Sequence, residues 1–363
     1  MDRRQFLSTA AVAGMGLASL GCAAPSTAAP ATFFDSLPRY KGFNLLDIYN
    51  AGLPYKRYEE SDFDVLAEWG FTFVRLPTSY QFWSSPDPAG WMTIDPFAIE
   101  DNLVRAVQLG ADRGIHVNIN FHRAPGYCVN SPAEPLDLWT DSYALDACAY
   151  HWAYFANRFR DVPPAQLSFN LLNEPGDVSA EAYDRVHRRL VSAIRDVDPD
   201  RPIIVDARGW GNDPVPIDFG PDVAISARGY SPRELSSFDA PWLDERWPTP
   251  TWPLQKYEND QLVTVDKGYL KRKDIDPFVR VQQAGTAVHV GEFGVYRAAP
   301  HDVSLRWTED YLSLWRDAGF GWAMWGLYGD FGILDSGRAD VAYEDFRGHK
   351  LDRRLLELLR SHL

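Results

Sequence analysis

Eight short apolar runs that alternate with helix-like stretches are the feature of this sequence that most restricts its fold. We expect a β-strand in each of residues 40–46, 71–77, 115–122, 167–174, 202–208, 223–230, 287–294 and 321–327. Most connections are long enough for a helix, and two of them, residues 97–114 and 181–197, are amphipathic. Strands that alternate with helices in this way predict an α/β fold of the (β/α)8 TIM-barrel type. Residues 32–363 are expected to form this single domain.

One connection is too long for a simple helix. Residues 231–275 contain three tryptophans, several prolines and the basic stretch KGYLKRK (267–273). A connection of this length inside a domain is usually a functional loop or lid. We therefore expect the segment to have that role, and we see no linker to a second domain.

The first 31 residues have the pattern of an export signal. Arg3 and Arg4 precede an Ala- and Gly-rich apolar run, which is typical of a twin-arginine signal and is too short to span a membrane. Residues 19–22 form an imperfect lipobox that would make Cys22 a lipid-anchored first residue, whereas residues 29–31 fit an ordinary cleavage site. We therefore predict export across the cytoplasmic membrane, to a secreted, periplasmic or lipid-anchored location.

Charge and cysteine content exclude several classes of function. The net charge of −14 argues against a nucleic-acid partner. Beyond the signal only Cys128 and Cys148 remain, and the sequence leaves open whether they pair. Neither cysteine has a metal-ligand spacing, and no CxxC or HExxH motif is present, so no metal or organic cofactor is expected.

Polar residues stand at the ends of the predicted strands, where chemistry is located in barrels of this type. They are Arg75, His122, Asn173, Glu174, Arg208, Arg228, Tyr230, Glu292 and Trp325. Each alone has a simpler explanation, such as a structural histidine or a salt-bridge partner. Their common position around one rim favours a functional site.

Two of these residues, Glu174 and Glu292, are carboxylates on opposite sides of the barrel mouth. Cleavage of a glycosidic bond uses such a pair: one carboxyl protonates the leaving oxygen, and the other attacks the sugar carbon or activates water. Pro175 is expected to hold Glu174 in an extended backbone conformation that aims its side chain off the strand end. Asn173 could bind a sugar hydroxyl next to the reacting carbon.

The motifs VRLP, NFHRAPGY, LLNEP, GYSP, HVGEFGV and AMWGLYGDFGIL, in this order, resemble glycoside hydrolase family 5, a family of retaining (β/α)8 hydrolases. NFHRAPGY and EDYLSLW are similar to a clostridial endoglucanase subgroup. The resemblance implies that Glu174 is the general acid/base, with a raised pKa, and that Glu292 is the nucleophile. It also implies substrate-binding or orienting roles and a cis peptide bond after Trp325. The residues with these roles are Arg75, His122, Asn173, Tyr230 and Trp325.

Arg228 departs from the family pattern, in which the sixth strand usually ends His-x-Tyr. Arginine is always charged and can only donate hydrogen bonds, whereas histidine can be neutral and accept one. Because side chains alternate along a strand, Arg228 and Tyr230 should point to the same face, toward Glu292. We expect Arg228 to donate either to the nucleophile region or to substrate hydroxyls.

These observations predict a retaining, endoglucanase-like β-glycosidase that acts on a neutral β-glucan or β-glucoside, with an oligo- or polysaccharide as its partner. A mannan- or β-1,3-glucan-active hydrolase is the alternative with the same machinery. A non-catalytic cell-surface glycan-binding protein is the alternative from another class, although binding alone would not require two carboxylates. We expect a monomer.

Overall fold

The computed structural model describes residues 33–214, 216 and 218–363, and these form one compact unit. The predicted export signal, including Arg3, Arg4 and Cys22, lies outside the described residues. Among the described helices, none has both the length and the apolar character needed to cross a membrane.

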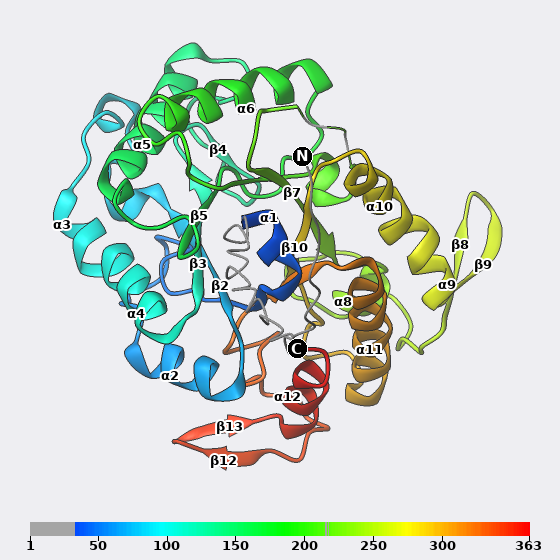
Figure 1. Ribbon diagram of the computed structural model, residues 1–363. Helices are drawn as coiled ribbons and strands as arrows, with labels where there is room; N and C mark the ends of the chain where they lie inside the picture. Colours follow the sequence, from blue (N-terminus) through cyan, green and yellow to red (C-terminus); the bar gives the residue numbers. More distant parts are fainter. Residues whose placement is uncertain (1–32, 215, 217) are drawn as a thin grey trace, which may run out of the picture. The chain divides into compact units, whose positions relative to one another are not determined.

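Eight parallel strands close into a barrel, as the alternating pattern predicts (Figure 1). They are β1 (Lys41–Asn44), β2 (Phe73–Ser79), β3 (His116–Ala124), β5 (Leu167–Asn170), β6 (Ile203–Asp206), β7 (Val223–Gly229), β10 (Val288–Phe293) and β11 (Gly321–Met324). Each strand pairs with its neighbours along the chain, and β11 pairs with β1 to close the ring. Each of the predicted runs overlaps one of these strands, and β2 and β3 extend two residues past the predicted ends at 77 and 122.

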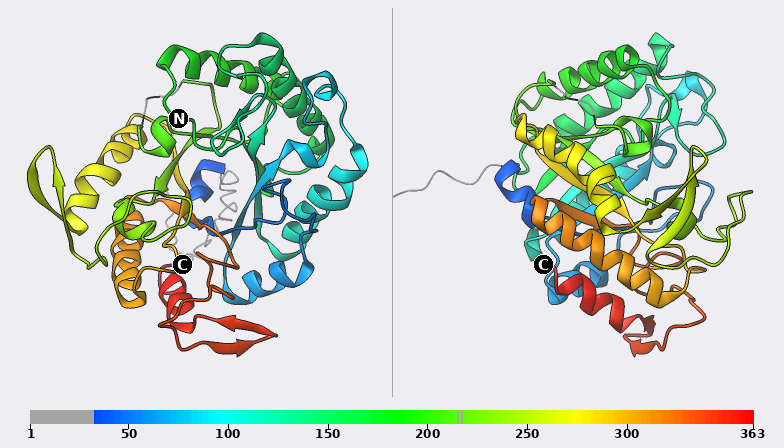
Figure 2. Two further views of the ribbon diagram at one scale, coloured as in Figure 1. Left: turned by 180° about the vertical axis from the view of Figure 1, so that it is seen from behind. Right: turned by 90° about the vertical axis from the view of Figure 1, so that its right-hand side faces the viewer.

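Helices between the strands surround the barrel (Figures 1 and 2). The longer ones are α2 (Glu60–Trp69), α4 (Arg105–Arg113), α5 (Ser142–Phe159), α6 (Ala180–Arg195), α10 (Asp276–Gln283), α11 (His301–Ala318) and α12 (Arg353–Arg360). The predicted helix at 97–114 is confirmed, because α3 (Pro96–Ile99) and a π-helical segment, η4 (Glu100–Val104), lead directly into α4. α6 confirms the helix at 181–197, and its buried face includes Val186, Leu190 and Ile194, at the expected spacing.

A short N-terminal segment covers the end of the barrel where the strands begin. It consists of α1 (Phe33–Ser36) and the 3-10 helix η1 (Leu37–Arg39). Phe33, Leu37 and Tyr40 belong to a small buried cluster with Phe73 at the start of β2 and with Ala323. In Figure 1, viewed along the barrel, α1 overlies the ring of strands, and the side view in Figure 2 places it at one end of the barrel. The opposite end, where the strands finish, is left for the cleft.

The long connection at 231–275 is partly structured. It contains α8 (Arg233–Ser236), an antiparallel hairpin of β8 (Leu254–Glu258) and β9 (Gln261–Val265), α9 (Lys267–Leu270) and the π-helical segment η5 (Lys271–Ile275). The hairpin projects beyond the surrounding helices in both Figure 1 and Figure 2. The basic stretch 267–273 is helical and continues into α10. The sequence pattern of this segment indicated a loop or lid but not the hairpin.

The remaining elements are short. They are η2 (Tyr80–Phe82), η3 (Pro88–Gly90), β4 (Tyr127–Cys128), α7 (Arg208–Gly211), β12 (Glu344–Phe346) and β13 (His349–Leu351). Cys128 lies on β4 and Cys148 is buried on α5, and both are free thiols. The pairing that the sequence left open is therefore not formed in this structure.

Candidate active site

A cleft of about 1220 Å³ lies at the ends of the strands and collects most of the predicted site residues. His122, Glu174, Tyr230, Glu292 and Trp325 all line it. The long connection contributes Trp242, Trp247 and Lys256 to its wall, so the expected functional loop forms part of the cleft.

Glu292 is placed by an irregularity in β10. The pairing register between β10 and β7 shifts between Val290 and Glu292, which puts Glu292 opposite Arg228. Such bulges re-aim a side chain at the rim of a barrel. Gly291 permits the bulge, because a Cβ at this position would lie 2.5 Å from Ser226 Oγ. The Glu292 side chain is thereby directed into the site while only 4% of it remains exposed.

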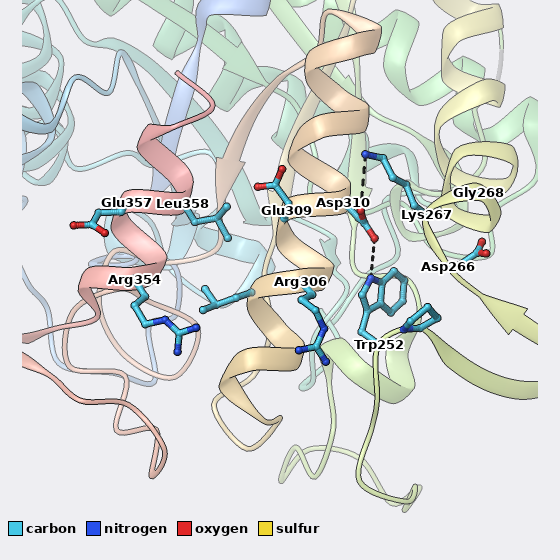
Figure 3. A pocket seen from close by; sticks show the side chains of 12 residues that line it. Trp252, Asp266, Lys267, Gly268, Arg306, Glu309, Asp310, Arg354, Glu357 and Leu358 are labelled. Carbon is cyan, nitrogen blue, oxygen red and sulfur yellow. Dashed lines mark hydrogen bonds and ion pairs between the residues drawn. The ribbon is translucent and has the colours of Figure 1, made fainter.

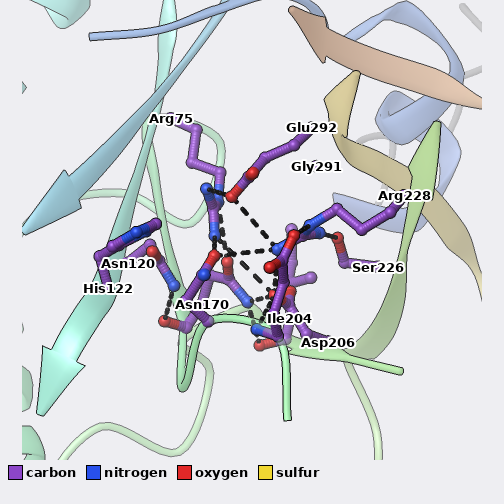
Figure 4. Close-up of polar contacts among 12 residues, drawn as sticks. Arg75, Asn120, His122, Asn170, Ile204, Asp206, Ser226, Arg228, Gly291 and Glu292 are labelled. Carbon is purple, nitrogen blue, oxygen red and sulfur yellow. Dashed lines mark hydrogen bonds and ion pairs between the residues drawn. The ribbon is translucent and has the colours of Figure 1, made fainter. Parts of the chain in front are cut away.

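Arg75, on β2, holds this carboxylate from one side (Figure 4). Its Nη1 donates to Glu292 Oε1 at 2.5 Å. The same Nη1 also donates to Asn44 Oδ1 at 2.9 Å, while Nε and Nη2 donate to Asn170 Oδ1 at 2.9 Å and to Asn173 Oδ1 at 2.8 Å. Arg75 is 1% exposed. A planar donor satisfied on all sides fixes both its own geometry and that of its carboxylate partner.

Arg228 and Tyr230 approach the carboxylates from β7, and both face the site as the strand alternation predicts. Tyr230 donates its hydroxyl to Glu292 Oε2 at 3.3 Å. Burial and the charge of Glu292 raise the pKa of Tyr230, so this hydroxyl stays protonated. Arg228 Nη2 lies 3.3 Å from Glu292 Oε1, and its Nε donates to Glu174 Oε1 at 2.9 Å. One guanidinium therefore bridges the two carboxylates.

The backbone of Glu174 is held on both sides of its Cα. Its N–H donates to Asp206 Oδ2 at 2.9 Å, and its carbonyl accepts from the Tyr127 hydroxyl at 2.6 Å. Glu174 has a φ of 48°, in the left-handed region that non-glycine residues rarely occupy. The extended conformation expected from Pro175 is therefore wrong, because these two hydrogen bonds outweigh the preference set by the proline.

The Glu174 side chain is 18% exposed and sits beside another carboxylate. Burial, and then the negative charge of Glu292, raise its pKa to about 7, although the positive charge of Arg228 opposes the shift. The expected raised pKa of Glu174 is confirmed. A carboxyl group with this pKa can hold a proton near neutral pH and release it during a reaction.

Asn173 and His122 each present an unpartnered polar atom. Asn173 Oδ1 accepts from Arg75 and Arg228, which fixes the amide and leaves its buried Nδ2 without a partner. His122 Nε2 accepts from Asn130 at 3.2 Å, and its Nδ1 has no partner. Burial lowers the pKa of His122 to about 4, so the ring is neutral with its proton on Nδ1. Both are donors without a protein partner; His122 lines the cleft, whereas Asn173 is buried directly beneath the two arginines that hold its oxygen.

Trp325 follows β11 and stands against His122, with ring centroids 5.5 Å apart and planes at 25°. The expected cis peptide after Trp325 is wrong, since the cis bonds among the described residues all precede prolines. Gly326 turns the chain instead with a φ of 86°, a conformation open to glycine, and the indole still lines the cleft.

Three buried residues that the sequence pattern did not indicate support the site. Asp206, Asn44 and Asn170 are at most 1% exposed and contact Arg75, Arg228 or the Glu174 backbone. Arg208, which the sequence pattern places at the rim after β6, pairs instead with Asp213 at 2.7 Å and lies outside this cluster. The available signal was a charged Asp206 inside the apolar run PIIVDA, because a buried carboxylate needs a partner.

A second cavity of about 730 Å³ lies outside the barrel, among α11, α12 and residues 252–268 (Figure 3). There Trp252 Nε1 donates to Asp310 at 2.8 Å, so this tryptophan does not face the cleft. None of the predicted site residues lines this cavity. Within the part of the chain that the structure describes, no three His, Cys, Asp or Glu side chains are grouped to hold a metal ion.

Two carboxylates at the mouth of a (β/α)8 barrel, one able to carry a proton and one held by an arginine and a tyrosine, define a glycoside hydrolase site. The family model described as "Cellulase (glycosyl hydrolase family 5)" matches residues 37–330 of this chain. The chain belongs to glycosyl hydrolase family 5, and it is an O-glycoside hydrolase of the retaining type, as predicted.

Individual relatives agree with this assignment. Endoglucanase C of Acetivibrio thermocellus is 25% identical over 309 residues, which cover 78% of this chain and 88% of that protein. A solved structure described as a glycoside hydrolase superposes with a TM-score of 0.83 at 36% identity, over 89% of this chain and 99% of the other. Cel5A of Thermotoga maritima in complex with cellobiose shares the fold, with a TM-score of 0.72 at 21% identity, over 90% of this chain and 99% of that one.

Proposed function

We propose that this protein is an endo-acting β-glucanase that cleaves a neutral β-1,4-glucan with retention of configuration. The observation that carries the proposal is the pair Glu174 and Glu292, joined through the guanidinium of Arg228 at the floor of a long cleft. The relatives named endoglucanases support the choice of glucan.

Glu292 is the nucleophile in this account. Arg75 and Tyr230 each donate to one of its two oxygens and fix the direction of its side chain. One oxygen attacks the anomeric carbon, and the bond to the leaving oxygen breaks with its electron pair going to that oxygen. A covalent glycosyl-enzyme results. A neutral glucan brings no charge of its own that could stabilise the transition state. The fixed hydrogen-bond donors around Glu292 therefore supply the electrostatic preorganisation.

Glu174 supplies the proton that the leaving oxygen needs. Its raised pKa, about 7, allows it to start protonated. After donating the proton it is a carboxylate next to Arg228, and it can then take a proton from the water that hydrolyses the glycosyl-enzyme. The same residue thus acts as acid in the first step and as base in the second.

Asn173, His122 and Trp325 bind the sugar next to the scissile bond. The unpartnered Asn173 Nδ2 and His122 Nδ1 are donors for sugar hydroxyls, and leaving them without a partner would be costly in a buried site. Trp325 offers a flat apolar face beside His122 for the sugar ring.

A substrate panel tests the proposal. The protein is expected to release reducing ends from a soluble β-1,4-glucan and to shorten the polymer early, as internal cleavage does. Glu292→Gln should abolish this activity. Glu309→Gln is the matched control, because this carboxylate is 51% exposed and pairs with His362 outside the cleft. Hydrolysis of mannan or β-1,3-glucan in preference to β-1,4-glucan would overturn the choice of substrate, and no hydrolysis of any of them would overturn the proposal.

The cellular location follows from the N-terminal pattern alone. We propose export by the twin-arginine route, with Cys22 as a candidate lipid attachment site and a monomeric mature protein. Arg3→Lys with Arg4→Lys should retain the protein in the cytoplasm, and unchanged export would point to the general secretory route. Cys22→Ser should release the protein from membranes if the lipobox is used. Gel filtration should give the apparent mass of a single chain if the mature protein is a monomer.

A further inference from the structure

Asp206 occupies the centre of the site without lining the cleft. It is fully buried at the end of β6. Its Oδ1 accepts from Asn170 Nδ2 at 2.9 Å, and its Oδ2 accepts from Arg228 Nη2. Burial opposes its ionisation, but the positive charges of Arg228 and Arg75 keep the pKa of Asp206 below its usual value. Asp206 is therefore a buried group whose surroundings favour the carboxylate form, beside Glu174 and Glu292.

The first contact of functional interest joins Asp206 to the Glu174 backbone. The same Oδ2 that meets Arg228 also accepts the Glu174 N–H at 2.9 Å. Glu174 is in the left-handed region, with a φ of 48°, and such a conformation persists only where the surroundings impose it. Asp206 is one of the two groups that impose it; the other is the Tyr127 hydroxyl on the carbonyl.

The second contact balances charge. Arginine at position 228, where the resemblance led us to expect histidine, adds a permanent positive charge between Glu174 and Glu292. Asp206 supplies the opposite charge at the same guanidinium. Figure 4 shows Asp206 beside Arg228 within the cluster, and Asp206 Oδ2 also lies 3.8 Å from Arg75 Nη2. The pair adds no net charge to the site.

We propose that Asp206 is a positioning residue for the hydrolysis, holding the Glu174 backbone and the Arg228 guanidinium as one unit and offsetting the Arg228 charge beside the acid/base. This inference rests on the proposed function and deepens it. In this arrangement Asp206 and Arg228 act as a coupled pair, so the effect of losing one depends on whether the other is present.

Asp206 and Arg228 shift the pKa of Glu174 in opposite directions. The negative charge of Asp206 favours the protonated acid, and the positive charge of Arg228 favours the carboxylate. The charged or titratable groups around Glu174, from all the strands that contribute to the site, are Arg75, Tyr127, Asp206, Arg228, Tyr230 and Glu292. Only the Asp206–Arg228 pair changes in the variants that follow.

The test is the pH profile of kcat/KM on cellotetraose, a substrate whose poor leaving group needs the protonated acid. Asp206→Asn should move the alkaline limb to lower pH by about one unit or more, because Arg228 is then unopposed. Arg228→Gln should move it to higher pH. In the double variant the loss of Asp206 should move the limb by less than it does in the wild-type background, because the Arg228 charge that Asp206 offsets is already absent. Asp213→Asn is the matched control, since it neutralises a carboxylate in an ion pair outside the cluster, with Arg208.

An alkaline limb that stays in place in Asp206→Asn, or moves to higher pH, overturns the inference. The inference is also overturned if the loss of Asp206 moves the limb equally in the wild-type and Arg228→Gln backgrounds. If Asp206→Asn fails to fold, the remaining variants decide. If the alkaline limb of the double variant lies at lower pH than that of Arg228→Gln, the inference is supported. If the two limbs lie at the same pH, the inference is overturned. A wild-type protein that cleaves no β-glycan would instead overturn the proposed function, so the two failures are distinguishable.

Discussion

Removal of the Arg75 guanidinium tests how the nucleophile is held. Arg75→Met replaces a buried cation by an apolar side chain of similar length. Glu292, 4% exposed, then keeps only its longer contacts, each at 3.3 Å, with Tyr230 and Arg228. The hydrogen bonds to the oxygens of Asn44, Asn170 and Asn173 are lost as well.

The magnitude follows from the burial of the pair. Breaking one partner of a buried ion pair typically lowers the free energy of unfolding by about 3–5 kcal/mol, because the remaining charge is left uncompensated. We expect a loss toward the lower end of that range for Arg75→Met, because the Arg228 cation still lies 3.3 Å from Glu292. A fall in kcat/KM of about 10²–10³ should accompany it, similar to removal of a preorganised transition-state donor. Arg75→Lys should be intermediate, since an ammonium keeps the charge but cannot reach all four oxygens.

Urea unfolding with an unchanged m-value measures the stability difference, and initial rates on a soluble β-glucan measure the activity. Arg188→Met is the matched control, because Arg188 is 54% exposed and its pair with Asp184 lies on the surface of α6. That pair should contribute less than about 1 kcal/mol. If Arg75→Met unfolded at the same urea concentration as wild type and kept its rate, our account of Arg75 as the support of Glu292 would be wrong.

Three further expectations concern the carboxylates and their bridge. Glu174→Ala should largely spare the glycosylation step with an activated aryl β-cellobioside but slow it with cellotetraose, because a good leaving group needs little protonation; equal losses on both would remove Glu174 from the role of acid. The wild-type kcat/KM on cellotetraose should fall as pH rises through about 7, since the pKa of Glu174 is raised to that value and the deprotonated group cannot act as acid; a rate that stays level from pH 6 to pH 9 would contradict this. Arg228→His should keep measurable hydrolysis, slowed by about ten- to a hundredfold, and should shift the preference among glycosides, because a charge-assisted hydrogen bond of about 1.5–3 kcal/mol is removed; a wild-type rate and profile would show that the contacts of Arg228 do not matter for the reaction.

The barrel and the rim of the site could be predicted because both depend on periodic patterns. Each strand appears in the sequence as an apolar run, and a polar residue at the end of such a run is expected at the rim where the strands finish. Arg228 and Tyr230 were placed correctly for the same reason, since the spacing of two residues fixes a common face.

The features that were missed depend on contacts between distant parts of the chain. The left-handed backbone of Glu174 results from Asp206 and Tyr127, and neither lies near Pro175 in the sequence. Asp206 and Arg208 are two positions apart, so strand alternation places them on the same face and could not show which of them turns into the cluster. The geometry after Trp325 was expected from resemblance, and Gly326 makes the turn in another way.

The anomeric configuration of the first product tests the central claim most directly. Two carboxylates that flank the scissile bond at about 5–5.5 Å lead to a covalent intermediate and retention, whereas a wider spacing admits a water and leads to inversion. Glu174 and Glu292 contact the same guanidinium, which favours the close spacing. Proton NMR of a cello-oligosaccharide digest, recorded before mutarotation, should show the β-anomer of the newly formed reducing end first. Initial appearance of the α-anomer would contradict the assignment of Glu292 as nucleophile.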